Sequence, residues 1–363
     1  MTNRFRCLTL VLILASGFQN LKESENEPLY FTMNNEWREV TLDEEKFSFL
    51  GLDSLINHSV RLLSETSNEP RLFYCDLETS VCADGECRLA SIKVYWNLIG
   101  NYVGYGIHNE DPLTKYDHDP FEREDYEKLH QLLLDNNSIL RRKTMYDLVD
   151  KVPIDSISKN NSNNIDGLSS GTKKEIASAV VKGGLYSCYT LWHLVHGEVK
   201  QLMNSYLESI ESDSLRNYFL YSDYQDYQLY ALKQLSKNEF EEHAEQIGKI
   251  FLEAQSITRT YILKKMPDNA LKNITSEIYR MFPLIGINSR TQLINRLNAA
   301  DTEAVDVLSV YVSEMTKNQL KAYLEFLKAN PDRLNSKIES QLKEAGNSQE
   351  LVNSYLIKDF FER

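Results

Sequence analysis

The chain has 363 residues, of which 42% are hydrophobic, and its 53 acidic and 40 basic side chains give a formal net charge of −13. That hydrophobic fraction is enough for a buried core, which excludes global disorder, and the length predicts two domains or one large one. Because binding to nucleic-acid phosphates needs a basic face, the acidic balance argues against a nucleic-acid partner.

Residues 1–17 have the pattern of a cleavable signal peptide. Arg4 and Arg6 precede the apolar run CLTLVLILA, and small residues at 15–17 suit cleavage. The run is too short to span a bilayer, and no second apolar stretch of about 18 residues follows. Phe18 stands where a lipid-bearing cysteine would be required. We therefore expect a secreted protein, periplasmic or extracellular, without a membrane span or lipid anchor.

Four cysteines remain after cleavage: Cys75, Cys82, Cys87 and Cys188. An even number in an oxidising compartment suggests disulfide bonds, and three pairings are possible. Cys82 and Cys87 flank the sequence ADGE, whose Asp-Gly step is a turn signal. A local Cys82–Cys87 bridge is therefore the first choice. A redox dithiol or a zinc site is the alternative, although the CxxC spacing that such sites use is absent.

The first half of the mature chain changes character at Arg71. Residues 18–70 are polar and acidic, which predicts a loose N-terminal segment followed by a short helix around Leu52–Leu63. Residues Arg71–Asp76 and Arg88–Ile107 are rich in Val, Ile, Tyr and Trp with turn residues between them. This composition predicts the strands of a small antiparallel sheet.

Helices are expected to follow this sheet. The acidic, proline-bearing stretch Asp117–Glu122 predicts a helix start, and that helix is expected to end near Asn136. A second short helix is expected from Leu140 to Val149. The Ser/Asn-rich residues 154–165 predict an exposed loop.

From Thr172 onward the pattern is helical. Four apolar groups recur at nearly even steps along the chain, and each opens a segment that closes on Leu or Met. The centres are Phe219, Phe251, Phe282 and Tyr311, and the closing residues are Leu235, Met266, Leu297 and Leu327. A period of roughly 30 residues is typical of helical hairpins that stack into an α-solenoid, with an irregular bundle as the alternative.

These patterns together predict the fold class. We expect an α+β N-terminal domain with a small antiparallel sheet at residues 71–197, followed by an all-α, solenoid-like helical-repeat region at residues 198–363. Stacked hairpins create extended surfaces, so the helical region is expected to bind a protein partner.

The most specific stretch is Asp166-Gly167-Leu168-Ser169-Ser170-Gly171-Thr172, which lies directly before a predicted helix. A threonine at a helix N-terminus places its hydroxyl beside unpaired backbone N–H groups, and these groups stabilise an attached phosphate. The same threonine can form a capping box with Glu175, an arrangement that requires no cofactor.

This stretch resembles the flavin-attachment motif Asp-x-x-Ser-Gly-Ala-Thr of FMN-binding domains in exported subunits of Rnf-type and sodium-pumping quinone reductase complexes. Asp166, Ser169 and Thr172 match the motif, whereas Ser170 and Gly171 replace its Gly and Ala. The resemblance implies FMN bound by these five residues and esterified through its phosphate to Thr172. It also implies an extracytoplasmic flavin-linked electron-transfer module.

A wider resemblance covers Val81–Gly197. This stretch is similar to exported bacterial proteins of unassigned function, in which three short segments recur as landmarks: Trp96–Gly100, Pro112–Lys115 and Tyr189–His193. The similarity implies that residues 71–197 form one unit, and it adds no mechanism.

Aromatic side chains near the motif are candidates for covering a flavin ring. Trp96, Tyr102 and Tyr105 are available in the strand-rich run, although strand aromatics usually fill the packed face of a sheet. His193 and His196 lie at i and i+3 on one helical face, which is compatible with half of a metal site or with a hydrogen-bonded pair.

Hydrolase signatures are weak. Asp117, His118 and Asp119 are compatible with proton transfer, but a helix-capping cluster is the simpler interpretation. The motifs GxSxG, HExxH and GxxxxGK[ST] are absent. The alternative to the flavin-linked module is therefore a non-enzymatic envelope scaffold that binds protein without a cofactor.

Overall fold

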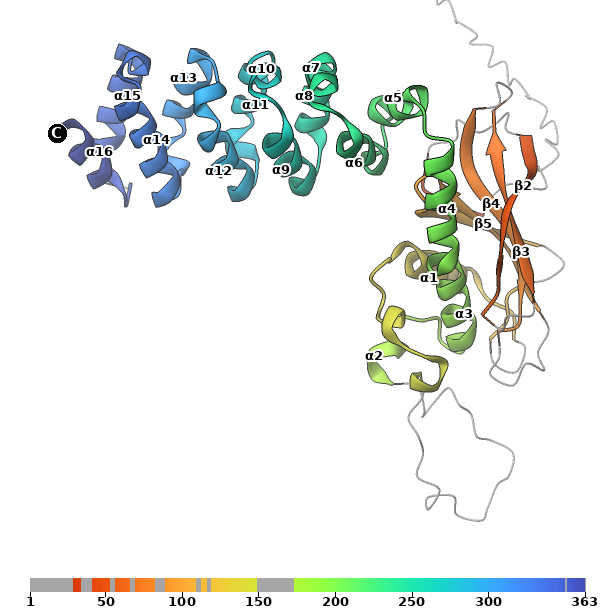
Figure 1. Cartoon of the computed structure of the whole chain (residues 1–363). Coiled ribbons are helices and arrows are strands. Elements are labelled where there is room, and N and C mark those ends of the chain that lie inside the picture. The colour runs from red at the N-terminus through yellow and green to blue at the C-terminus, as the bar shows by residue number, and fades with distance from the viewer. Residues whose placement is uncertain are drawn as a thin grey trace, which may run out of the picture. The chain divides into compact units, whose positions relative to one another are not determined.

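The computed structural model describes residues 29–33, 41–52, 56–65, 69–81, 89–108, 112–115, 119–148, 173–349 and 351–362. Contacts between Cα atoms divide the chain into two compact units, Met1–Ser209 (unit 1) and Ile210–Arg363 (unit 2). Figure 1 shows a sheet with helices in the first unit and an array of helices in the second. In the described part of the chain, no helix combines the length and the apolar character that crossing a membrane would need.

Unit 1 is built on an antiparallel sheet with six strands among the described residues, in the order β1-β6-β5-β4-β3-β2. The strands are β1 (Tyr30–Phe31), β2 (Thr41–Leu50), β3 (Asn57–Ser64), β4 (Pro70–Thr79), β5 (Ala90–Asn97) and β6 (Tyr102–Ile107). The strands expected from residues 71–76 and 88–107 are confirmed as β4, β5 and β6.

The prediction of a short helix around Leu52–Leu63 is wrong, because residues 57–64 form β3. Within this strand His58, Val60 and Leu62 are buried at every second position, which is the period of a strand with one face covered. Strands β2 and β4 pair with its two edges. The 18–70 segment therefore contributes three strands to the sheet, β1, β2 and β3.

Both faces of the central strands are buried. Residues that pair directly across strands share a face, so Phe73 lies on the same face as Trp96, its partner. The indole Nε1 of Trp96 donates a hydrogen bond to the carbonyl of Val195 at 3.0 Å, which joins this face to a helix. The opposite face holds a separate apolar cluster of Leu63, Leu72, Tyr74, Tyr95 and Val103, against which Phe31 and Met33 pack. This double burial explains why Leu72–Cys75 in β4 and Val94–Trp96 in β5 are uninterrupted apolar runs.

Two glycines shape the β5–β6–β1 side of the sheet. Gly100 has φ +72° in the turn between β5 and β6, a conformation that side chains with a Cβ rarely adopt. In the same turn, the side-chain oxygen of Asn97 accepts the backbone N–H of Asn101 at 2.9 Å. A Cβ on Gly104 would collide with the carbonyl oxygen of Tyr30, so glycine is required for β1 to pair closely with β6.

The helices of unit 1 follow the sheet in sequence. They are α1 (Arg123–Leu134), η2 (Ile139–Arg142), η3 (Met145–Asp147), α2 (Lys174–Ala177), α3 (Leu185–His196) and α4 (Glu198–Ser209). The helix expected after Asp117–Glu122 is confirmed as α1, with Glu122 at its N-cap and a capping box with Asp125. The described part of 140–149 forms two short 3-10 turns instead of one helix.

Helix α4 belongs to unit 1. Its residues Val199, Met203 and Leu207 are buried, and the ring of Tyr206 lies 5.9 Å from that of Phe73 on β4. The division between the units therefore falls after Ser209 and not after Gly197, where the sequence pattern predicted it.

Unit 2 consists of helical hairpins (Figure 1). Its longer helices are α5 (Asp213–Tyr221), α6 (Gln225–Gln234), α8 (Ala244–Glu253), α9 (Ser256–Lys265), α12 (Ile287–Asn295), α13 (Thr302–Val310), α14 (Lys317–Ala329), α15 (Ser336–Asn347) and α16 (Ser354–Glu362). The shorter ones are α7 (Lys237–Glu242), α10 (Asp268–Lys272), α11 (Thr275–Arg280), η5 (Phe282–Leu284), η6 (Leu297–Ala299), η7 (Val312–Glu314) and η8 (Pro331–Arg333).

The hairpins repeat in the structure as the sequence predicts. Their second helices α6, α9, α12 and α14 begin at Gln225, Ser256, Ile287 and Lys317, which are almost evenly spaced. Helices α8, α11, α13 and α15 contact one another in order along one row, and α9, α12, α14 and α16 form a second row. The predicted fold class, an α+β domain followed by a solenoid-like all-α region, is therefore confirmed.

The register of the predicted repeat is off at two of its four centres. Counted from the starts of the second helices, Phe251 and Phe282 occupy equivalent positions. The residues that correspond to them in the first and fourth hairpins are Leu220 and Val312, each next to the predicted centre.

Candidate partner-binding surface

The predicted flavin-attachment residues lie outside the described residues. These are Asp166, Ser169, Ser170, Gly171 and Thr172. The helix that follows them, α2, has only four residues and has Lys173 at its N-cap, without a side-chain cap. Because a helix dipole grows with the number of aligned peptides, one turn offers an attached phosphate little stabilisation. The Glu175 carboxylate forms an ion pair with Lys143 at 3.1 Å.

The three aromatic residues proposed to cover a flavin are packed in the core of unit 1. Trp96 and Tyr105 are 0% exposed and Tyr102 is 5% exposed. Their polar atoms all have protein partners: besides the Trp96 bond, the Tyr105 hydroxyl donates to the carbonyl of Tyr126 at 2.9 Å, and the Tyr102 hydroxyl lies 2.9 Å from Nδ1 of His130. The usual role of strand aromatics, filling the packed face, accounts for all three.

His130 on α1 is the centre of an aromatic cluster. The Tyr30 ring stacks on its imidazole with centroids 5.1 Å apart, and the Tyr102 and Tyr105 rings lie within 6.2 Å. Burial lowers the pKa of His130 and raises the pKa of Tyr102 well above its ordinary value. The cluster is thus a neutral hydrogen-bonded contact that fixes α1 on β6 and β1.

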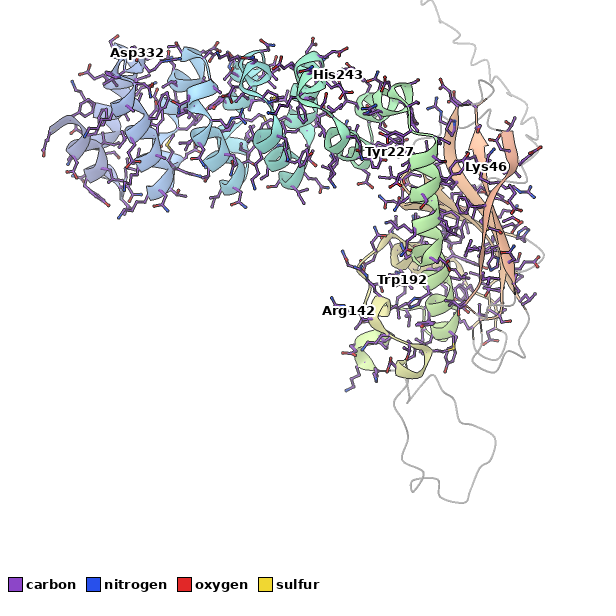
Figure 2. All side chains as sticks on the ribbon, viewed as in Figure 1. Lys46, Arg142, Trp192, Tyr227, His243 and Asp332 are labelled. Carbon is purple, nitrogen blue, oxygen red and sulfur yellow. The ribbon has the colours of Figure 1, made fainter. Side chains whose placement is uncertain are left out.

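The predicted histidine pair caps backbone carbonyls. Nε2 of His193 lies 3.1 Å from the carbonyl oxygen of Leu140, and Nε2 of His196 lies 2.8 Å from that of Leu133. Just before them on α3, Trp192 donates from Nε1 to the carbonyl of Asp135 at 3.0 Å; Figure 2 labels this side chain. One face of α3 therefore holds the segment that ends α1. Among the described residues, no group of three or more His, Cys, Asp or Glu side chains could hold a metal ion.

Some of the remaining predicted residues lie outside the described residues and one lies among them. Asp117, His118, Cys82 and Cys87 lie outside the described residues, so the predicted Cys82–Cys87 bridge stays a prediction. Asp119 is described, and its carbonyl accepts the backbone N–H of Lys115 at 2.6 Å.

Cys75 and Cys188 are buried free thiols in different elements. Cys75 lies on β4 and Cys188 on α3, and neither forms a disulfide. Burial raises the pKa of Cys188 to about 12 and also raises that of Cys75. Because the thiolate is the reactive form of cysteine, both side chains behave as small apolar core residues.

Sequence reasoning missed a recurrent polar clamp in unit 2. The fourth residue of α9 is Arg259, which donates to the carbonyls of Phe251 and Leu252 at 2.8 and 2.7 Å. The fourth residue of α12 is Arg290, which donates to the carbonyls of Pro283 and Ile285 at 2.6 and 2.9 Å. Each guanidinium satisfies the carbonyls left free where the first helix of its hairpin ends. Their separation by one period of the repeat is the sequence signal that could have revealed the clamp.

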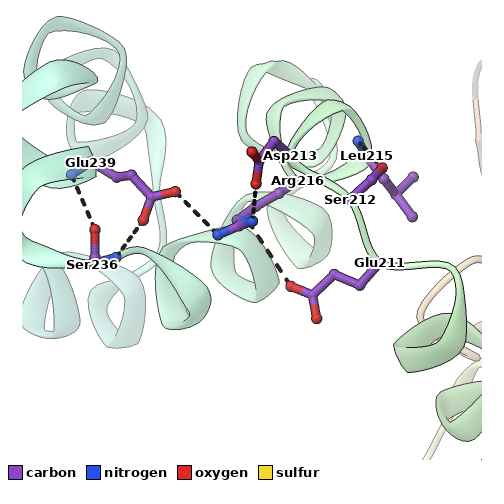
Figure 3. Close-up of polar contacts among 7 residues, drawn as sticks. All are labelled: Glu211, Ser212, Asp213, Leu215, Arg216, Ser236 and Glu239. Carbon is purple, nitrogen blue, oxygen red and sulfur yellow. Dashed lines mark hydrogen bonds and ion pairs between the residues drawn. The ribbon is translucent and has the colours of Figure 1, made fainter.

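Polar contacts also join successive hairpins. Arg216 on α5 forms ion pairs with Glu239 on α7 at 3.1 Å and with Asp213 at 2.5 Å, and its Nε lies 4.0 Å from Glu211. Figure 3 shows this arrangement, in which Glu239 also forms a capping box with Ser236. The Arg216 side chain is only 19% exposed, so the pairing is partly desolvated and fixes the first hairpin on the second.

A similar bond network links the later hairpins. Arg296 at the end of α12 donates to the carbonyls of Leu263 and Met266 at 2.7 and 2.8 Å, which lie at the end of α9. Farther along, Asn335 before α15 donates to Asp306 on α13 at 2.6 Å. The array is therefore held by polar bonds as well as by its apolar interior.

Comparison with known protein families, with curated proteins and with solved structures finds no match.

Proposed function

We propose that this protein is a scaffold that docks a protein partner on the helical array of unit 2. The observation that carries the proposal is the arrangement of the hairpins in two rows, in which each hairpin contacts its neighbours along the row. Such arrays expose long surfaces made of equivalent positions, and these surfaces suit the binding of extended protein segments. The predicted signal peptide would place this activity outside the cytoplasm.

Site-specific cross-linking in the producing cell tests the proposal. A photo-reactive amino acid is placed in the full chain at Ile257 or Lys264 in unit 2, or at Arg123 on α1 in unit 1; all three side chains are exposed. We expect a discrete cross-linked protein adduct from one or both positions in unit 2 and none from Arg123. Adducts from Arg123 alone, or none from any position, would reject a docking role for the array.

The flavin-linked electron-transfer module stays a prediction of the sequence resemblance alone. Its test is mass spectrometry of the peptide that contains Thr172, after co-expression with a flavin transferase. A mass increase equal to one FMN would establish the cofactor, and the protein would be yellow. An unmodified peptide and a colourless protein would leave the cofactor-free scaffold as the function.

A further inference from the structure

The exposed large apolar side chains of unit 2 are concentrated at one place in each hairpin, where the first helix ends or the second begins. With their exposed fractions they are Tyr221 (56%), Ile257 (70%), Leu284 (74%), Ile287 (62%), Val310 (53%), Val352 (87%) and Tyr355 (44%). We call these seven residues the apolar edge. Over the described stretches 210–349 and 351–362, the only other such side chain is Phe361 (37%), in the last turn of α16.

Contacts between successive hairpin turns place the residues of the apolar edge along one side of the array. Between the first and second hairpins, Gln225 Nε2 donates to the Glu253 carbonyl at 3.5 Å. Between the second and third, the backbone of Gly286 lies close to Ser256, since a Cβ on Gly286 would be 3.8 Å from Ser256 Oγ. Arg290 Nη1 of the third hairpin donates to the Glu314 carbonyl of the fourth at 3.3 Å, and Lys317 Nζ of the fourth lies 5.6 Å from the centre of the Tyr355 ring of the fifth. Each contact joins the turn of one hairpin to that of the next. The turns that carry the apolar side chains therefore follow one another along five hairpins.

The opposite edge of the same hairpins has a different character. The turns that leave the second helices expose Lys233, Lys264, Lys265, Asn298 and Lys328. Lysines there complement the C-terminal ends of the helix dipoles, so they need no partner to explain them. Single exposed apolar residues are normal on any protein, but a contiguous apolar strip marks an interaction surface.

Charge around the apolar edge selects the partner. Asp223 lies in the turn of the first hairpin, Asp226 is in the first turn of α6 and Glu253 ends α8; none of the three is buried. Lys317, an exposed basic residue at the turn of the fourth hairpin, lies over the Tyr355 ring of the last hairpin. A basic segment with apolar side chains complements such a strip, whereas an anionic lipid surface would be repelled by it.

We propose that the apolar edge binds a basic amphipathic helix of a partner protein, with its basic residues beside Asp223, Asp226 and Glu253. Packed helices are spaced by about 8–10 Å, and seven residues of an α-helix rise by about 10.5 Å. Side chains seven residues apart on such a helix would therefore meet successive hairpins. This inference rests on the proposed docking function and names the surface and the chemistry of its partner.

Binding of synthetic helices to the full chain tests the proposal. The probes are a leucine–lysine helix of about 25 residues, long enough to cover about four hairpin spacings, and a leucine–glutamate helix with the same leucines. We expect the lysine helix to bind and the glutamate helix to bind at least tenfold more weakly. The combined change Ile257→Ser, Leu284→Ser and Ile287→Ser should weaken binding of the lysine helix at least tenfold.

A matched variant at the opposite edge provides the control. Asn238→Ser, Asn269→Ser and Asn298→Ser change three exposed side chains without changing charge, and binding should stay as in the unchanged chain. Circular dichroism verifies that both variants stay folded. Equal binding of the two helices, or loss in the control variant, overturns the proposal.

Other occupants of the edge give distinct results. Binding to phospholipid vesicles that is lost in the triple serine variant, with no binding of the lysine helix, would identify a membrane surface and overturn the proposal. Cross-linked adducts from Lys264 but not from Ile257 would overturn it as well, while leaving the docking function of unit 2 intact.

Discussion

Arg290 shows how one side chain holds a hairpin together. Its guanidinium is 17% exposed and donates to the carbonyls of Pro283, Ile285 and Glu314, so it joins the end of one helix, the start of its own and the next turn. It also lies over the Phe282 ring at 5.2 Å. Removing it would leave partly buried carbonyls without donors, a cost that exceeds the gain of making a hydrogen bond.

We expect Arg290→Ala to lower the free energy of unfolding of unit 2 by about 2 kcal/mol, the range for hydrogen bonds from a charged donor. Chemical denaturation followed by circular dichroism in the helical region measures this loss. The control is Lys321→Ala on the following helix, whose side chain is 62% exposed and should change stability by less than about 0.5 kcal/mol. Equal losses in the two variants would contradict a clamp role for Arg290.

Residue-level roles were the least predictable part of the molecule. The i and i+3 spacing of His193 and His196 indicated a common helix face, and the structure confirms that both lie on α3. Their partners are the carbonyls of Leu140 and Leu133, which lie far earlier in the chain. No local pattern encodes which carbonyl a side chain will meet, because that depends on how α3 docks on α1.

At the scale of elements, α3 is the helix that organises unit 1. Its Val195 carbonyl accepts the hydrogen bond of the Trp96 indole on the sheet. Its side chains Trp192, His193 and His196 form hydrogen bonds with backbone carbonyls at the end of α1 and just after it. Two of the three landmark segments of the sequence, Trp96–Gly100 and Tyr189–His193, thus contribute to this junction. Burial lowers the pKa of His196 to about 4 and also lowers the pKa of His193.

These shifts make unit 1 sensitive to acid. The folded state keeps the imidazoles neutral, whereas an unfolded histidine binds a proton near pH 6.5. The unfolded state therefore binds more protons between about pH 6.5 and 4, and the free energy of unfolding falls over that window as pH decreases. Above about pH 6.5 the histidines are neutral in both states, so they no longer lower the free energy of unfolding.

Tryptophan fluorescence during urea denaturation measures the effect, because Trp96 and Trp192 are packed in unit 1 and the sequence of unit 2 contains no tryptophan. We expect His196→Gln, whose amide can still donate to Leu133, to make the decline between pH 6.5 and 4 shallower. The control His243→Gln, in unit 2, should leave it unchanged. An identical decline in all three proteins would show that His196 does not carry the effect.

The elements differed in how well the sequence predicted them. The β-branched and aromatic runs of β4 to β6 and the capped start of α1 were identifiable, since composition and capping residues act locally. Strand β3 was mistaken for a helix because Leu52, Ile56 and Leu63 have spacings that also fit a helical face. Its strand conformation is imposed by pairing with β2 and β4, which a local pattern does not contain.

At the scale of the whole molecule, the boundary between the units is a testable feature. A signal-cleaved chain that ends at Gly197 lacks α4 and would expose apolar side chains that Met203, Tyr206 and Leu207 cover in unit 1. We expect it to unfold at a lower temperature and less cooperatively than a chain that ends at Ser209. Differential scanning calorimetry compares the two, and equal transitions would show that α4 is dispensable for unit 1.

The repeat itself was predictable from the sequence because a period is a property of the whole segment and survives errors at single positions. The predicted step between hairpins closely matches the structure, although two of the four centres were off register by one position. What the sequence could not supply was the exposure of the turns, since burial depends on the stacking of neighbouring hairpins.

The modular construction of unit 2 has a consequence for its evolution. Each hairpin is one repeat unit, one period in length, and it contacts the unit before it and the unit after it. Duplicating or deleting the gene segment for one hairpin would lengthen or shorten the apolar edge by one hairpin and leave the spacing between the other hairpins unchanged. If the apolar edge binds a partner helix as proposed, the length of helix that it contacts would change in steps of one hairpin, independently of the chemistry at each step.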